Sequence, residues 1–200
     1  MQRNYQRELE QIIKKHQETK TVPTLFLHSC CAPCSSYVLE YLAQHFKITV
    51  FYYNPNIYPD EEYRKRVFEQ QEFINKMNFK YPVAFLEGAF DKAKFYGAVK
   101  GYEEYPEGQE RCFICYSLRL SETAKQAKDL QFDYFATTLS ISPMKNAVKL
   151  NRIGEEIANE IGVKWLPADF KKKNGYKRSI ELSAEYGLYR QNYCGCEYST

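Results

Sequence analysis

The sequence predicts a Rossmann-like α/β sandwich, an architecture in which helices cover both faces of a parallel β-sheet. Short apolar runs alternate along the chain with longer segments of helical periodicity. The runs are apolar at successive positions, as is typical of strands that are buried on both faces. Of the 200 residues, 44% are hydrophobic, which fits a single domain with a sizeable core. We expect residues 21–200 to form that domain and residues 1–20 to be an N-terminal helical extension.

The first quarter of the chain shows this alternation clearly. Residues 1–20 have apolar side chains at helical spacing within a polar segment. The apolar run 22–27 is the first predicted strand, and residues 35–44 follow it with the spacing of a helix. The β-branched and aromatic run 48–53 is the second strand, and the turn sequence Asn54-Pro55-Asn56 ends it.

The middle of the chain continues with one strand and three helices. Pro59 and the acidic residues after it favour the start of a helix whose apolar face extends to Met77. Residues 82–86 are the third strand. Residues 90–99 and 112–130 are predicted helices, separated by a polar loop. Together with a cysteine-containing C-terminal tail, these two helices are expected additions to the sheet.

The last part of the chain supplies two more strands. The aromatic run 132–139 is the fourth strand, and Ser142-Pro143 makes a turn after it. Residues 145–161 form a helix with one apolar side, and residues 163–166 form the fifth strand. A basic loop then leads to a final helix near residues 179–189.

The composition argues against several classes of protein. No apolar run approaches the roughly 18–20 residues of a membrane-spanning helix, and the charged first ten residues lack the apolar middle of a signal peptide. We therefore expect a cytoplasmic protein with reduced thiols and no membrane partner. Seven cysteines is an odd number, which argues against a closed disulfide framework. The net charge of +3 permits nucleic acid as a partner, and the 18 tyrosines and 13 phenylalanines could stack on bases.

Three cysteines stand within five residues, in the segment His28–Ser35, directly after the first predicted strand. They are Cys30, Cys31 and Cys34. Backbone N–H groups at a strand-to-helix turn favour anions, so these thiols should ionise easily. We interpret the segment as a metal or redox site, beside which His28 is a further candidate.

Two more cysteine pairs occur later in the sequence. Cys112 and Cys115 have C-x2-C spacing at a helix start, which places two sulfurs about one turn apart on one side. Arg119 lies on the same face and could balance thiolate charge or hold a substrate oxygen. Cys194 and Cys196 flank a glycine near the C-terminus. Their spacing can close a strained, easily reduced disulfide or chelate a metal.

The predicted fold brings several of these segments to one place. Ligands of parallel α/β sheets bind beyond the carboxyl ends of the strands. The turn Cys30–Cys34 follows the first strand, Asn54–Asn56 follows the second, and Thr137–Ser140 ends the fourth. We therefore expect all three segments to line one edge of the sheet.

The cysteine spacing allows two kinds of metal site. Structural zinc commonly takes four thiolates from two C-x2-C units, and only Cys112 and Cys115 fit that pattern. A zinc site would also leave three thiols unexplained. An iron–sulfur cluster takes four thiolates that need not come from two such pairs. The spacing therefore favours a cluster, with a C-x-C dithiol left over and Cys34 near both.

A basic segment follows the fifth predicted strand. It contains Lys171, Lys172, Lys173, Lys177 and Arg178. As a flexible loop beside a redox site, with Tyr176 among the cations, it could follow the phosphate backbone of a nucleic acid.

Five short motifs, taken together, resemble those of a known family. They are His28-x-Cys-Cys-x-Pro-Cys34, Tyr53-Asn-Pro-Asn56, Arg111-Cys-x2-Cys-Tyr-x2-Arg-Leu120, Thr137-Thr-Leu-x-x-Ser142-Pro143 and Tyr189-Arg-Gln-x-Tyr-Cys-Gly-Cys196. Their combination and order resemble the QueH family of epoxyqueuosine reductases, from about residue 25 to the C-terminus. No single motif is decisive, but the set is highly specific.

The resemblance implies an activity, a partner and a fold. The activity is the last step of queuosine biosynthesis, in which epoxyqueuosine in a tRNA anticodon is reduced to queuosine with electrons from an unknown donor. The fold implied is similar to the adenine-nucleotide hydrolase-like (HUP-type) α/β domains. Members of that group that bind ATP carry a glycine- and serine-rich loop after the first strand. This chain has cysteines there, which argues against ATP chemistry.

The resemblance also implies a cofactor and roles for the cysteines. A 4Fe–4S cluster is expected on Cys30, Cys31, Cys112 and Cys115. Cys194 and Cys196 are then a redox-active pair, with Cys34 and Arg119 as further catalytic candidates. A physical alternative is an additional mononuclear iron, bound by Cys30 or Cys31 together with Cys34 and Cys196.

Two rival functions belong to other classes. A zinc-stabilised RNA-binding module without catalysis would explain the basic loop and four cysteines, but it leaves the C-x-C tail without a role. A thiol oxidoreductase of small molecules would need no metal. The colour and metal content of the protein after anaerobic purification discriminate between these functions.

Overall fold

In the computed structural model, which describes residues 3–199, five parallel strands form one sheet with the order β3-β2-β1-β4-β5. The strands are β1 (Thr24–His28), β2 (Lys47–Tyr52), β3 (Val83–Glu87), β4 (Tyr134–Thr137) and β5 (Lys164–Trp165). This is the strand order of a Rossmann-like sheet, in which the direction of winding reverses between β1 and β4. The predicted α/β fold is therefore confirmed.

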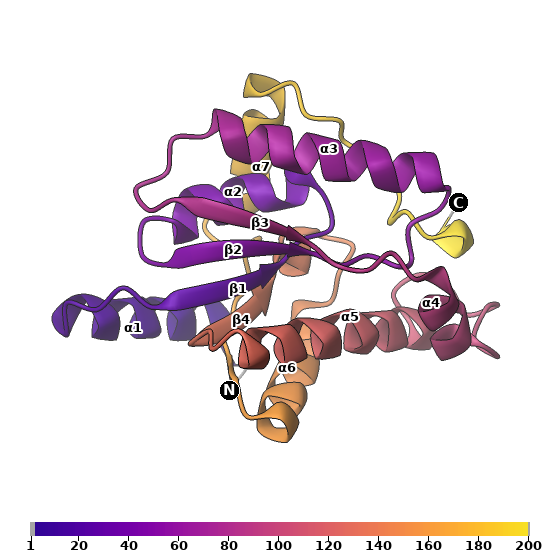
Figure 1. The fold of residues 1–200 in the computed structure, drawn as a ribbon, viewed down its shortest axis with the longest axis horizontal. Helices are drawn as coiled ribbons and strands as arrows, with labels where there is room; N and C mark the ends of the chain where they lie inside the picture. Colours follow the sequence, from indigo (N-terminus) through magenta and orange to yellow (C-terminus); the bar gives the residue numbers. More distant parts are fainter. Residues whose placement is uncertain (1–2, 200) are drawn as a thin grey trace.

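Helices cover both faces of the sheet. Within residues 3–199 they are α1 (Tyr5–Glu18), α2 (Ala32–Leu42), α3 (Asp60–Lys76), α4 (Lys92–Val99), α5 (Glu110–Asp129), α6 (Ala147–Ile161) and α7 (Gly175–Glu185), with the short 3-10 helices η1 (Thr138–Ile141) and η2 (Glu197–Ser199). Helices α2, α3 and α7 lie on one side of the sheet, and α5 and α6 lie on the other (Figure 1). No helix among the described residues is long and apolar enough to span a bilayer.

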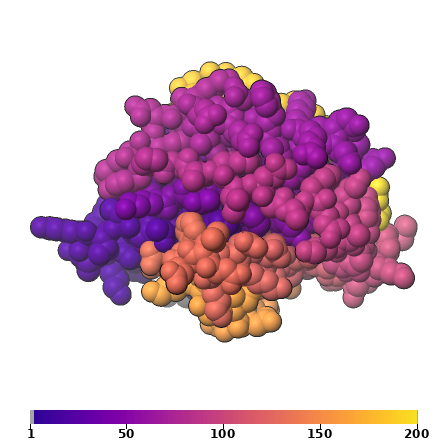
Figure 2. Space-filling view, in the orientation of Figure 1, coloured from indigo at the N-terminus to yellow at the C-terminus, as the bar shows by residue number. Residues whose placement is uncertain are grey.

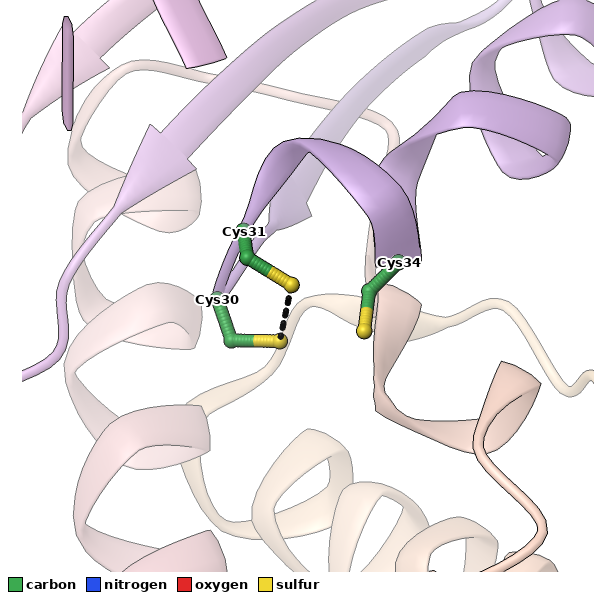
Figure 3. A group of neighbouring side chains, drawn as sticks. All are labelled: Cys30, Cys31 and Cys34. Atoms are coloured by element: carbon green, nitrogen blue, oxygen red, sulfur yellow. Dashed lines mark hydrogen bonds between the residues drawn. The ribbon is translucent and has the colours of Figure 1, made fainter. Parts of the chain in front are cut away.

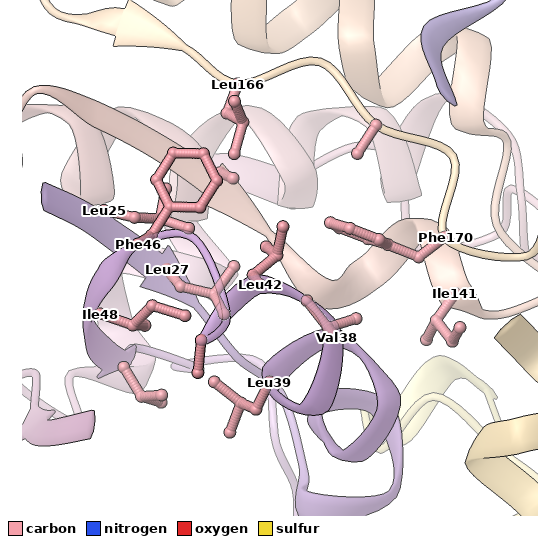
Figure 4. Close-up of a cluster of buried hydrophobic side chains, with 14 of the residues drawn as sticks. Leu25, Leu27, Val38, Leu39, Leu42, Phe46, Ile48, Ile141, Leu166 and Phe170 are labelled. Atoms are coloured by element: carbon pink, nitrogen blue, oxygen red, sulfur yellow. The ribbon is translucent and has the colours of Figure 1, made fainter. Parts of the chain in front are cut away.

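The central strand β1 contributes to a separate core on each face of the sheet. Leu25 and Leu27 pack with Val38 of α2 in one cluster of buried side chains (Figure 4). Phe26, which points to the opposite face, packs with Leu120 of α5 in a second cluster. Because successive strand residues point to opposite faces, a strand buried on both sides has the continuous apolar run seen in the sequence.

The N-terminal helix α1 joins the first of these cores. Its residues Leu9 and Ile13 are buried in the cluster that contains Leu25 and Leu27. In the space-filling view, the residues of α1 form one end of the molecule (Figure 2). The helix begins at the capping residue Asn4, whose side chain accepts a hydrogen bond from the backbone of Arg7.

Three of the element boundaries that differ from the prediction affect the site. Helix α2 begins at Ala32 instead of Ser35, because Pro33 is favourable in a first helical turn. Strand β4 ends at Thr137, whose hydroxyl accepts a hydrogen bond from the backbone N–H of Leu139 and starts η1. Helix α7 begins at Gly175, where a Cβ atom would lie 2.0 Å from a backbone oxygen.

Candidate metal centre and pocket

The ends of three strands meet at one edge of the sheet, as the sequence predicts. His28, the last residue of β1, is hydrogen-bonded through Nδ1 to Thr137 Oγ1 at 2.9 Å and through Nε2 to the carbonyl oxygen of Tyr53 at 3.1 Å. The Asn54 side chain donates a hydrogen bond to the backbone oxygen of Ser29 at 2.8 Å. The turn that carries the three cysteines, Cys30–Cys34, is called the thiol turn below. These hydrogen bonds hold it between the ends of β2 and β4.

His28 belongs to the support of this turn. Its ring is fully buried, and both ring nitrogens have partners. Burial, assisted by the positive charge of Arg119, lowers the pKa of His28 to about 3. The imidazole is therefore neutral at physiological pH and connects strands β2 and β4.

The sulfur atoms of the thiol turn point toward one another (Figure 3). Cys31 is the N-cap of α2, and Cys34 lies in its first turn. The sulfurs of Cys30, Cys31 and Cys34 all lie within 4.8 Å of one another, and those of the first two are 3.8 Å apart. Although Cys30 and Cys31 are neighbours in sequence, their side chains converge. These three thiols could hold a metal ion.

The three thiols share negative charge unequally. Hydrogen bonds from Cys31 and Cys34 lower the pKa of the Cys30 thiol well below its usual value, against the effect of burial. Hydrogen bonding with Cys30 in turn raises the pKa of Cys31 and of Cys34, and burial adds to both rises. Among the three thiols, Cys30 therefore has the strongest tendency to ionise, and a thiolate is a ligand for a metal cation.

The buried side-chain amide of Gln70, in α3, supports the thiol turn through hydrogen bonds. Gln70 Oε1 accepts hydrogen bonds from Ser29 Oγ at 2.7 Å and from Ser35 Oγ at 3.0 Å. All three side chains have no measurable exposure. Because Ser29 and Ser35 flank the cysteines on both sides, Gln70 fixes the two ends of the turn. Nothing in the local sequence around Gln70 distinguishes it from its exposed neighbour Gln71.

The second cysteine pair lies at the start of α5. Cys112 Sγ accepts a hydrogen bond from the backbone N–H of Gly108 at 3.2 Å. Cys115, one turn further, is buried in a small cluster with Phe95 of α4 and with Cys196. Burial raises the pKa of Cys115 to about 12, while the positive charge of Arg119 opposes this rise.

The C-terminal tail is docked against this cluster. The backbone oxygen of Gly195 accepts a hydrogen bond from the N–H of Tyr58 at 2.8 Å, and Arg66 Nη1 donates to the backbone oxygen of Cys194 at 3.1 Å. Gly195 has a φ of +106°, and a Cβ atom there would lie 2.8 Å from Arg66 Nη1. The backbone conformation therefore favours glycine between the two cysteines, and a larger residue there would also have to displace the end of the Arg66 side chain.

Arg119 lies among all three cysteine groups. It is only 1% exposed, and its Nη1 donates to Asn56 Oδ1 at 3.0 Å. Burial would lower its pKa, but the nearby thiols of Cys115, Cys194 and Cys30 raise it. Its Nε and Nη2 have no hydrogen-bond acceptor among the described residues. An anionic group bound beside the cysteines would satisfy these two buried donor groups.

A pocket opens beside the thiol turn. Four of the seven cysteines line it, namely Cys30, Cys31, Cys34 and Cys194. Its wall also includes the basic side chains Arg66, Arg119, Lys145 and Arg190 and the aromatic side chains Tyr176 and Tyr193. Cys112, Cys115 and Cys196 are buried and do not line it. The fold therefore gives the tail cysteines different surroundings, because Cys194 faces the pocket and Cys196 packs beside Cys115.

Sequence reasoning did not identify three of these basic side chains, Arg66, Lys145 and Arg190, as site residues. Arg66 is 1% exposed and reaches the pocket from the middle of α3, where it also pairs with Glu62 at 2.7 Å. Lys145 is 7% exposed and follows the Ser142-Pro143 turn. This position near the predicted site edge was the one feature of the sequence that could have indicated a role in the site. Their roles depend on tertiary contacts, which a single sequence does not reveal.

The basic segment after β5 is more ordered than a flexible loop. Lys171 pairs with Asp169 at 2.7 Å, Lys173 pairs with a glutamate of α1, and Arg178 pairs with Glu40 at 2.6 Å. Lys177 and Arg178 lie in α7, since the helix starts earlier than predicted. Lys172 and Lys177 are exposed and have no ion pair in the described part of the chain.

Comparisons with known proteins agree with the cysteine pattern. The family model described as epoxyqueuosine reductase QueH matches residues 25–200. A protein of Streptococcus pyogenes serotype M1 named epoxyqueuosine reductase QueH is 45% identical over 198 residues, which cover 98% of this chain and 78% of that protein. Proteins with the same name from Staphylococcus epidermidis and Thermotoga maritima are 42% and 38% identical. The matches cover 98% and 88% of this chain and 84% and 90% of those proteins.

Proposed function

The chain belongs to the QueH family of epoxyqueuosine reductases, and we propose that it reduces epoxyqueuosine in tRNA to queuosine. The epoxide takes up two electrons and two protons, both C–O bonds break, and the products are a cyclopentene ring and water. The main structural support is the convergence of three sulfurs beside a pocket at the carboxyl edge of the sheet. That edge is where parallel α/β domains bind ligands.

We propose that Cys30, Cys31, Cys112 and Cys115 hold a 4Fe–4S cluster. The donor set fits such a group, because thiolates are the ligands that clusters take. The two cysteines of the turn converge at 3.8 Å, and the free N–H groups of Arg119 could donate hydrogen bonds to cluster sulfur. A bound cluster supplies electrons one at a time, so a two-electron reduction needs a second centre.

Two candidates for the second centre follow from the remaining cysteines. Cys194 and Cys196 could act as a redox-active pair, in which Cys194 faces the pocket. Alternatively, Cys34 could bind an additional iron with Cys30 or Cys31 and with Cys196. The first alternative is supported by the docking of the C-x-C tail, and the second by the proximity of Cys34 to the other two turn sulfurs.

Substitution of Cys34 separates these alternatives. In Cys34→Ser, a second iron would lose a ligand, whereas a cluster and a Cys194/Cys196 pair would keep all of theirs. We expect the iron content to stay unchanged and the activity to survive in part if the tail pair is the second centre. Loss of about one iron per chain, measured after anaerobic reconstitution, would instead assign that centre to iron. Cys194→Ser is the matched variant, since only the redox pair requires that thiol.

The pocket and its surroundings offer contacts for the RNA. The modified base must leave the anticodon stack to enter a pocket, and aromatic side chains can hold an extruded base. Tyr176 and Tyr193 line the wall for that purpose, with Arg190 beside them. Lys172 and Lys177 are exposed and could contact phosphates, whereas Lys171, Lys173 and Arg178 already have acidic partners.

A zinc-stabilised RNA-binding module is the second candidate, because three convergent thiols could also bind zinc. Anaerobic purification distinguishes the two. A brown protein whose colour bleaches with dithionite supports the iron–sulfur enzyme. A colourless protein that contains one zinc ion would reject it.

A further inference from the structure

Lys145 is a buried cation in the pocket wall that the proposed reaction has not yet used. It follows the turn after η1, and the backbone N–H of Lys145 donates to the Ser142 oxygen at 3.2 Å. Its side chain is 6% exposed, and its ammonium group donates a hydrogen bond to Glu107 Oε1 at 2.9 Å. Both residues line the pocket that contains Cys30, Cys31 and Cys34.

Stability alone does not account for the Lys145–Glu107 pair, since the cost of desolvating a buried ion pair offsets most of its Coulomb energy. An ammonium group has three N–H donors. Glu107 is the one side-chain acceptor that Lys145 has among the described residues. The remaining donors are therefore free to bind an oxygen atom of a molecule in the pocket.

Two of the other pocket cations, Arg66 and Arg190, have more hydrogen-bond partners within the protein than Lys145 has. Arg66 is bound to Glu62 and to the backbone of Cys194, and Arg190 donates to Ser179 and Ser183. Arg119 has one hydrogen-bond partner, Asn56, which does not line the pocket, and thiols from all three cysteine groups raise its pKa. Lys145 differs from these because its partner is itself a pocket side chain.

We propose that Lys145 is a catalytic residue that donates a hydrogen bond to the epoxide oxygen of the substrate, and that Glu107 is the positioning residue that orients it. This inference rests on the proposed function. As the C–O bonds break, negative charge develops on the oxygen, and a fixed ammonium group stabilises that charge more in the transition state than in the ground state. The role requires no transfer of electrons by Lys145.

The test compares Lys145→Met with a matched variant, Lys149→Met, in the reconstituted enzyme. Lys149 lies in α6, does not line the pocket and also carries one positive charge. We expect Lys145→Met to reduce the single-turnover rate about 100-fold, as the loss of an oxyanion donor does in other enzymes. Lys149→Met should stay within about twofold of the wild type, and all three proteins should bind equal amounts of iron.

A binding measurement separates a chemical role from a structural one. The wild type should bind tRNA carrying epoxyqueuosine more tightly than the same tRNA carrying queuosine, which lacks the epoxide oxygen. Lys145→Met should lose this preference and keep its affinity for the queuosine form. An unchanged preference, or a rate loss that only follows a loss of iron, would overturn the proposal.

A second variant keeps the test decisive if Lys145→Met does not fold. Glu107→Gln leaves the ammonium group in place without its carboxylate partner, at a residue that is partly exposed. We expect a rate reduction of about tenfold, and a wild-type rate would contradict the positioning role. If the wild type reduces no epoxyqueuosine, the proposed function itself fails. If the wild type is active and the variants match it, the role of Lys145 alone fails.

Discussion

At the scale of single residues, Arg119 connects the three cysteine groups. They lie far apart in the sequence, in the turn after β1, at the start of α5 and in the C-terminal tail. The guanidinium group interacts electrostatically with one thiol from each, at Cys115, Cys194 and Cys30. A buried cation in this position offsets the negative charge that several thiolates would otherwise concentrate in one place.

If the proposed cluster is present, we predict that Arg119→Gln shifts its midpoint potential to more negative values. A nearby positive charge stabilises the reduced form, which carries one more negative charge, so removing the cation makes reduction harder. We expect a shift of about 60 mV, a tenfold change in the equilibrium constant of a one-electron couple. Arg119→Lys, which keeps the charge, should remain near the wild-type value in a redox titration followed by electron paramagnetic resonance. Equal potentials in all three proteins would restrict Arg119 to a structural role.

At this scale, most of the candidate site residues could be predicted from the sequence. The cysteines carry their own signal, because clustered thiols in an odd number have few structural uses, and Arg119 could be inferred from its spacing after Cys115. The site positions of Gln70, Arg66 and Lys145 could not be inferred in this way. Each of these residues lies in an ordinary helical or turn sequence and reaches the site only because of how the chain folds. Polar residues of this kind are recognised by burial, which requires the structure.

At the scale of elements, α3 positions the thiol turn. Gln70 contacts the turn from a helix that follows β2, and Arg66, one helical turn earlier, holds the C-terminal tail. Residues four apart lie on the same face of a helix, so one face of α3 supports two of the three cysteine groups.

We predict that Gln70→Ala destabilises the protein by roughly 2–4 kcal/mol, because it leaves the buried hydroxyls of Ser29 and Ser35 without their partner and removes packed atoms. The iron content after gel filtration should also fall, since the turn would lose its support. Gln71→Ala is the matched control, at an exposed neighbour of the same residue type. Urea unfolding and iron analysis measure both effects. An unchanged iron content in Gln70→Ala would show that iron binding does not depend on this support.

The boundaries of the elements were harder to predict than their existence. The apolar runs of β1 and β2 identified two buried strands because both faces of the sheet are covered. The start of α7 at Gly175 was missed because it depends on the close approach of the Phe170 backbone, which has no local signature. The same tertiary packing changed a predicted flexible loop into a turn and a helix.

At the scale of the whole molecule, the parallel sheet explains why distant segments form one site. The winding reverses between β1 and β4, and the turn after β1, the segment after β2 and the helix η1 after β4 meet at that edge. Helix α5 and the docked tail then bring the other cysteines to the same side. A pocket lined by thiols and cations at this position suits an anionic RNA that presents one modified base.

The most direct test of iron-dependent epoxyqueuosine reduction is one assay of the anaerobically reconstituted protein. It is incubated with epoxyqueuosine-containing tRNA and a one-electron donor, and the nucleosides of the digested tRNA are analysed by mass spectrometry. We predict that protein containing iron and sulfide converts epoxyqueuosine to queuosine, with the loss of one oxygen atom, and that metal-free or zinc-loaded protein does not. Conversion by the zinc-loaded protein, or no conversion by a fully iron-loaded one, would contradict the proposed function.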